Sequence, residues 1–150
     1  MRRASRFRIS DRRCPVCLVP VRRTFECCSN QCSEELEDAR TSHGWLRVQH
    51  GDLTANLAEL EERLGLIQLK LERNELKAKT FGPTWSRLVS SGLFGKANRL
   101  RRLALKTFRK VSRLSQLLQP LDQQWKVLKE EWHHSEQELA RIEAILQKAC

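Results

Sequence analysis

The chain has 150 residues and a formal net charge of +10 at pH 7, and only six residues are glycine and four are proline. Charged residues make up 31% of it, a composition that favours long helices over a fold rich in β-strands. Nothing in it approaches the roughly 18 consecutive apolar residues that a membrane span requires, so we expect a soluble or at most peripheral protein.

The charge is distributed unevenly along the chain. Residues 1–25 carry eight arginines against Asp11 as their one acidic residue, and residues 76–121 carry eleven basic residues and no acidic one. Residues 26–75 and 122–150 each hold more acidic than basic residues. A block of unbalanced positive charge favours a polyanionic partner.

Two close pairs of cysteines, Cys14-Pro-Val-Cys17 and Cys28-Ser-Asn-Gln-Cys32, lie within 19 residues of each other. This spacing is typical of a structural zinc site, in which four thiolates close a tetrahedral cage and leave no position for water. Cys27 directly precedes Cys28 and is the alternative third ligand. We favour Cys28 because it stands just before Ser29, the expected N-cap of the following helix. The predicted ligands of a structural Zn²⁺ are Cys14, Cys17, Cys28 and Cys32.

The segment between the cysteine pairs is suited to a small hairpin, and a helix is expected from Ser29 toward Ser42. A knuckle, a hairpin and a helix start that supplies the last two ligands form a treble-clef zinc finger. Cys-Pro-x-Cys, an aromatic residue and Cys-Ser-x-x-Cys together resemble the compact zinc fingers of the YacG and MYM type, over residues 14 to about 40. Cys28, not Cys27, has the spacing found in those fingers. This chain differs from them at Leu18, where they usually have glycine, and at the inserted Glu26-Cys27.

Other uses of the cysteines fit the sequence less well. A redox role for Cys14 and Cys17 would be expected within a βαβ pattern, which does not surround them. A secreted disulfide scaffold would need a signal peptide, and residues 1–10 contain charge without an apolar segment. His43 or His50 replacing a cysteine as a ligand is a further alternative. Zinc-binding cysteines without an export signal predict a reducing compartment, the cytoplasm or the nucleus.

Apolar residues recur at alternating steps of four and three along two segments, which is typical of coiled coils. The first series is Leu53, Leu57, Leu60, Leu64, Ile67, Leu71, Asn74 and Ala78. The second is Leu100, Ala104, Thr107, Val111, Leu114, Leu118, Leu121, Trp125, Leu128, Trp132, Ser135, Leu139, Ile142 and Leu146. We call these two series the seam, and we expect Asn74 within it to fix the register or the oligomeric state.

The expected organisation is a basic arm (1–13), a zinc finger (14–42), a coiled-coil helix (52–80) and a basic amphipathic helix that continues into a coiled coil (84–150). We expect a break or a bend near Gly44 and Gly51, with Trp45 packed against the finger. Phe81-Gly82-Pro83 should end the first long helix, and Pro120 should kink or restart the second. The predicted fold is thus mostly α-helical, with a small treble-clef zinc finger followed by a long antiparallel coiled-coil hairpin. Because one hairpin leaves a seam exposed, we also expect a homodimer through the coiled coil.

Basic residues of the second helix fall on one stripe at steps of three and four. The planar guanidinium group of arginine can donate two parallel hydrogen bonds to phosphate oxygens. A rigid basic helix contacts the nucleic-acid backbone more than the base edges. The predicted nucleic-acid-binding residues are Arg2, Arg3, Arg6, Arg8, Arg12, Arg13, Arg22 and Arg23 near the N-terminus and Arg99, Arg102, Lys106, Arg109, Lys110 and Arg113 in the stripe.

The sequence therefore predicts a zinc-binding coiled-coil protein that binds nucleic acid without sequence preference, with RNA favoured over DNA. Its architecture is similar to that of the small cysteine-rich proteins of some plant RNA viruses, the hordeivirus gamma-b type, and this resemblance implies a regulatory role as a suppressor of RNA silencing. One alternative is an adaptor with a protein partner. Another is a peripheral protein whose residues 84–118 bind anionic membranes, although a membrane surface is not the favoured partner.

An enzyme is not expected. Glu130-x-x-His133 and Glu131-x-x-His134 have the spacing of di-iron ligands, but such sites need this pair on two helices together with further carboxylates. Only one segment of the chain supplies it.

Overall fold

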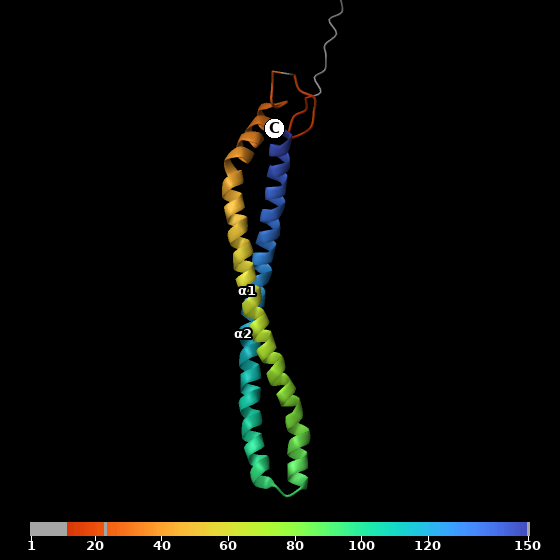
Figure 1. Ribbon diagram of the computed structural model, residues 1–150, viewed down its shortest axis with the longest axis vertical. Helices are drawn as coiled ribbons and strands as arrows, with labels where there is room; N and C mark the ends of the chain where they lie inside the picture. The colour runs from red at the N-terminus through yellow and green to blue at the C-terminus, as the bar shows by residue number, and fades with distance from the viewer. Residues whose placement is uncertain (1–11, 23, 150) are drawn as a thin grey trace, which may run out of the picture. The chain divides into compact units, whose positions relative to one another are not determined.

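A computed structural model describes residues 12–22 and 24–149. It contains two helices, α1 (Asn30–Ser90, 61 residues) and α2 (Phe94–Ala149, 56 residues), which pack against each other as an antiparallel hairpin (Figure 1). The described residues form no strand, only an isolated bridge between Arg13 and Pro20. The prediction of a mostly α-helical hairpin is confirmed. Neither helix in the described ranges has a stretch that is apolar enough to cross a membrane.

The chain divides into two compact units. The first, here called the cysteine unit, combines the residues up to Thr54 with those from Glu131 onward. It therefore contains the cysteine segment, the beginning of α1 and the end of α2. The second, here called the turn unit, is Ala55–Glu130 and contains the rest of both helices and the turn that joins them.

The seam is the buried side of both helices. Every residue of the two predicted series is buried or half-buried, with Leu57 and Leu60 among the most completely covered. The same register begins earlier than predicted. Leu36, Ala39, His43, Leu46 and His50 precede the first series at the same steps of three and four, and all five are buried or half-buried. We therefore include these five residues in the seam.

This earlier start explains why the predicted break at Gly44 and Gly51 does not occur. Each glycine directly follows a seam histidine and lies on the exposed side of α1, where the helix continues without interruption. Burial of the seam on both sides of each glycine outweighs the cost of about 1 kcal/mol that glycine carries in a helix. Trp45 does not pack against the finger, since 65% of its surface is exposed.

The predicted helix end at Phe81-Gly82-Pro83 is also wrong, because Pro83 lies inside α1. Of the two possibilities for Pro120, a restart is excluded, because α2 continues through it. Proline removes one backbone hydrogen bond and crowds the preceding turn. Pro83 and Pro120 are both exposed, so the freed carbonyls, four residues earlier, belong to exposed turns of the helix where water reaches them. The seam residues on either side remain buried and hold each helix together.

The turn between the helices is short, since α1 ends at Ser90 and α2 begins at Phe94. Gly92 has φ +72°, and it and Leu93 close the end of α1 with hydrogen bonds to the carbonyls of Val89 (3.0 Å) and Leu88 (2.9 Å). These two bonds form a Schellman motif, which requires a left-handed residue and therefore favours glycine.

Two polar residues of the seam, Asn74 and Thr107, bond within their own helix. The Asn74 side-chain amide donates to the Lys70 carbonyl at 2.6 Å, and the Thr107 hydroxyl donates to the Leu103 carbonyl at 3.1 Å. Asn74 thus makes no hydrogen bond across the hairpin. Tryptophans do so instead. In the turn unit Trp125 Nε1 donates to Glu61 at 3.0 Å, and in the cysteine unit Trp132 Nε1 donates to Thr54 at 2.9 Å.

Alanine substitutions test whether α1 is continuous through its glycines. A Cβ atom added at Gly44 or Gly51 meets no other atom within 4 Å. Because alanine is favoured over glycine inside a helix, Gly44→Ala and Gly51→Ala should each raise the free energy of unfolding by about 1 kcal/mol. Urea denaturation followed by circular dichroism measures this change.

Gly92→Ala is the matched control, because its left-handed backbone penalises a side chain by about 1 to 2 kcal/mol. This variant should lose stability. Unchanged or lower stability in both of the first two variants would show that α1 is interrupted there.

Candidate metal centre

Four thiols come together in the cysteine unit. The Sγ atoms of Cys14, Cys17, Cys28 and Cys32 all lie within 4.8 Å of one another. Cys17 and Cys28 are 3.2 Å apart at Sγ, and Cys28 and Cys32 are 3.6 Å apart. Tetrahedral Zn²⁺ with Zn–S bonds of about 2.3 Å places its sulfurs about 3.8 Å apart, so these separations suit one ion.

A tight turn positions the first two thiols. The Leu18 amide donates to the Cys14 carbonyl at 2.9 Å, and the Cys14 amide donates to the Val19 carbonyl at 2.8 Å. Leu18 has φ +64°, the left-handed conformation that glycine adopts most readily. Leucine therefore carries backbone strain at the position where the resembling fingers usually have glycine.

The start of α1 positions the other two thiols. Ser29 caps the helix, as predicted, because its hydroxyl accepts the Cys32 amide at 3.2 Å. Cys28 precedes the cap and Cys32 lies in the first turn. The helix cap thus fixes both sulfurs relative to each other and directs them toward the Cys14 turn.

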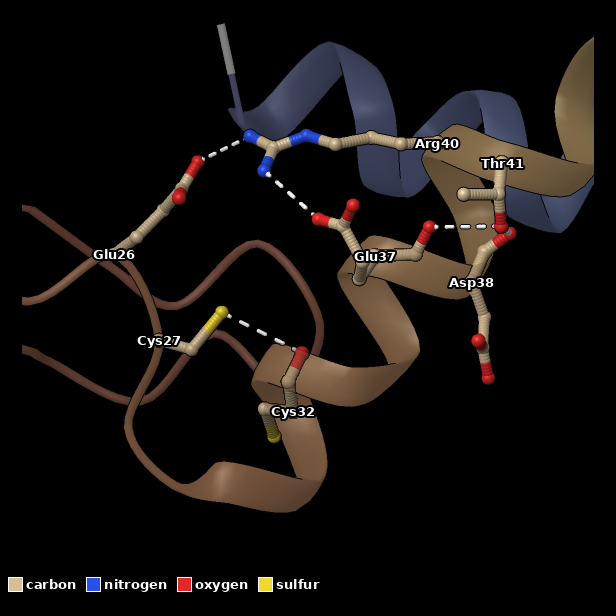
Figure 2. A network of polar contacts seen from close by, with 7 residues as sticks. All are labelled: Glu26, Cys27, Cys32, Glu37, Asp38, Arg40 and Thr41. Carbon is tan, nitrogen blue, oxygen red and sulfur yellow. Dashed lines mark hydrogen bonds and ion pairs between the residues drawn. The ribbon is translucent and has the colours of Figure 1, made fainter.

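Cys27, the alternative ligand, lies outside the cluster. Its Sγ donates to the Cys32 carbonyl at 3.4 Å, as Figure 2 shows. The side chain packs against the buried core of Leu36, Ala39 and Ile145. Burial, followed by the nearby Cys14, raises the pKa of the Cys27 thiol. Cys27 therefore has the surroundings of a packing residue.

The same core attaches the cysteine segment to both helices. Val16, from the turn that follows Cys14, packs against this core together with Ile142 and Leu146 of α2. Charged residues add to this attachment. Arg40 of α1 pairs with Glu26 in the loop before Cys27 and lies 3.8 Å from Glu37 (Figure 2). The site is thus built on the first turns of α1 and the last turns of α2.

Without a metal, the thiols differ strongly in acidity. Burial raises the pKa of Cys14, but the backbone amides of Cys17, Cys28 and Val16 hydrogen-bond its sulfur and together lower the pKa to about 6. Hydrogen bonds to Cys17 and Cys32 raise the pKa of Cys28 to about 12. The cluster therefore stabilises a thiolate at Cys14 and keeps a proton on Cys28, which a bound dication would displace.

The predicted basic stripe lies on the outward side of α2 in the turn unit. Arg99, Arg102, Lys106, Arg109 and Arg113 are all exposed and follow steps of three and four outside the seam positions. Within residues 12–22 and 24–149, none of the five forms an ion pair with a carboxylate. The stripe is therefore an uncompensated row of cations.

Lysines from both helices meet beside the seam. Lys110, Lys106 and Lys77 line a groove of about 440 Å³ together with Asn74 and Thr107. Lys77 belongs to α1 and was not among the predicted binding residues. Lys77 directly precedes the seam residue Ala78, and this position in the sequence could have predicted that it lies beside the seam.

The arginines near the N-terminus are a separate group. Arg12, Arg13 and Arg22 are exposed beside the Cys14 turn, in the cysteine unit. The stripe belongs to the other unit, the turn unit. The other predicted arginines, Arg2, Arg3, Arg6, Arg8 and Arg23, lie outside the described residues.

Comparison with known protein families, curated proteins and solved structures gives no significant match to this chain. The fold and the site themselves define its class. It is a helical hairpin with four cysteines placed close enough together to hold a metal ion.

Serine substitutions distinguish the two candidates for the third ligand. Cys28→Ser removes a thiol from the cluster and should reduce the bound zinc to well below one ion per chain after dialysis. Cys27→Ser changes a neighbouring thiol that packs against the core and should leave one zinc per chain. Elemental analysis of the two purified variants gives the ratio directly. Retention by Cys28→Ser together with loss by Cys27→Ser would reverse the assignment.

The affinity for zinc should rise with pH. The thiolate is the ligand, and the raised pKa of Cys28 means that this thiol gives up a proton when it binds. We expect the affinity to increase by about tenfold or more per pH unit between pH 6.5 and 8, the factor for one proton released. Competition with a chromophoric chelator, corrected for its own protonation, measures it. An affinity independent of pH would rule out thiolate ligation.

Proposed function

We propose that the protein holds a structural Zn²⁺ at the four clustered cysteines and binds RNA through the basic residues of the turn unit, without sequence preference. Thiolates are soft ligands, and a closed set of four is the donor set of structural zinc sites. In this proposal the ion stabilises the cysteine segment against the helices and takes no part in chemistry.

The uncompensated stripe carries the RNA-binding proposal. Neighbouring like charges on a helix repel by a few tenths of a kcal/mol per pair, so a row of five cations costs stability unless an anion offsets it. From Arg99 to Arg113 the row extends about 21 Å along α2 at 1.5 Å per residue. Its arginine forks can each bind phosphate oxygens through two parallel hydrogen bonds.

The chemistry of the stripe favours the backbone of RNA over its bases. The segment from Arg99 to Arg113 contains no asparagine or glutamine that could bind base edges. Double-stranded RNA is recognised largely by shape and through its phosphates and 2′-hydroxyls. A protein that covers RNA in this way can withhold it from other factors, and suppression of RNA silencing is the regulatory role that we include in the proposal.

An anionic membrane is a second candidate partner for the same unit. Phe81, Trp85, Leu100 and Phe108 line an apolar groove of about 320 Å³, and the exposed Phe94 lies close by in the chain. Apolar side chains among cations are typical of surfaces that bind acidic lipids. Co-sedimentation with vesicles that contain phosphatidylserine tests this candidate separately.

Glutamine substitutions in the stripe test RNA binding. Arg102→Gln with Arg109→Gln removes two phosphate contacts and should weaken binding to a duplex RNA of about 20 base pairs by about tenfold or more. Arg47→Gln with Lys148→Gln lowers the net charge equally in the cysteine unit and is the matched control. Fluorescence anisotropy measures both variants against the wild type.

The salt dependence of RNA binding tests the stripe independently. With about six phosphate contacts, raising the salt from 50 to 200 mM should weaken wild-type binding by about 10³-fold, and the stripe variant should show a smaller salt dependence. Equal losses in the two double variants, or binding that does not respond to salt, would contradict the proposed RNA surface.

A further inference from the structure

The outward side of α1 in the turn unit carries leucines that the hairpin leaves uncovered. Leu66, Leu69 and Leu76 are 52%, 53% and 64% exposed. They lie at steps of three and seven on the side of α1 opposite the seam, so α2 cannot cover them. Three exposed leucines on one helix face form an apolar patch that a second helix can bury.

Charged residues flank this patch in a self-complementary order. Glu62 and Arg63 precede Leu66, and Glu72 and Arg73 follow Leu69. All four charged residues are exposed, and none of them forms an ion pair within the part of the chain that the structure describes.

The order of these residues specifies one arrangement of two copies. Consider a second α1 that lies antiparallel to the first, with the twofold axis between Ile67 and Gln68. The numbers of two residues that face each other across this axis then add up to 135. Leu66 then faces Leu69 of the copy. Glu62 faces Arg73 and Arg63 faces Glu72, and the symmetry repeats every contact. A parallel arrangement would instead place Glu62 beside Glu62 and Arg73 beside Arg73, which is repulsive.

We infer that a second copy of this chain binds the outward face of α1 over residues 59–76, antiparallel to the first. The seam is less available for a dimer, because within each chain the hairpin already buries or half-buries its residues. The self-association surface therefore lies on the opposite side of the helix. This inference does not depend on zinc or on RNA binding. At 1.5 Å per residue it would place the two Gly92 turns about 70 Å apart along the paired helices.

Charge reversal tests both the surface and the orientation. Glu62→Arg alone, or Arg73→Glu alone, turns two attractive contacts of the dimer into two repulsive ones, so each should weaken dimerisation by about tenfold or more. The chain that carries both substitutions restores opposite charges across the twofold axis. Its dimer dissociation constant should return to within about threefold of the wild-type value.

The control is Lys79→Glu, which makes the same charge change as Arg73→Glu. Lys79 is exposed on α1 and would face the uncharged Asn56 of the copy, so dimerisation should be nearly unchanged. Sedimentation equilibrium over a range of protein concentrations measures all four variants, and circular dichroism verifies that each is as helical as the wild type.

Three results would overturn the inference. They are a wild-type chain that stays monomeric at the highest concentrations, single variants that dimerise as well as the wild type, and a double variant as weak as the single ones. The last result would mean that Glu62 and Arg73 do not face each other.

Discussion

Burial of the seam between α1 and α2 is the constraint on which the rest of the structure depends. Covering a leucine side chain such as Leu57 or Leu60 contributes about 1.5 to 3 kcal/mol, and residues of this kind recur every three or four positions along both helices. The sum outweighs the local costs of Gly44, Gly51, Pro83 and Pro120. It also decides which side of each helix faces outward, and so where every other chemical group is displayed.

The seam also anchors the cluster of thiols. Its first positions on α1, Leu36 and Ala39, form a core with Ile145 of α2, and Val16 from the cysteine turn packs against that core. The helix start that carries Cys32 is therefore held by the same contacts that hold the hairpin. A metal ion at the four sulfurs would close a segment in which Leu18, Val19 and Phe25 are exposed.

Much of this could be predicted from the sequence, because the period of the leucines and the spacing of the cysteines each have one simple structural explanation. The hairpin, the buried side of the helices after Leu53 and the capping role of Ser29 all followed from such patterns. The early part of the seam was not predicted. His43 and His50 occupy positions where an apolar residue is expected, so the apolar pattern is interrupted there. The helix ends were also missed, because local preferences of glycine and proline were given more weight than burial on both sides of them.

The position of Lys77 beside Lys106 and Lys110 depends on how α1 and α2 are paired, which no single segment of sequence determines. Pairing likewise makes the stripe from Arg99 to Arg113 an outward surface instead of part of the seam. This outward row of cations is the physical basis for the proposed interaction with RNA.

The most direct measurement is ultraviolet cross-linking of the zinc-loaded protein to a duplex RNA, followed by mass spectrometry of the cross-linked peptides. The account predicts adducts concentrated on peptides of residues 96–113, with further adducts near Lys77. Adducts confined to the cysteine unit, or a stripe that yields none, would contradict it.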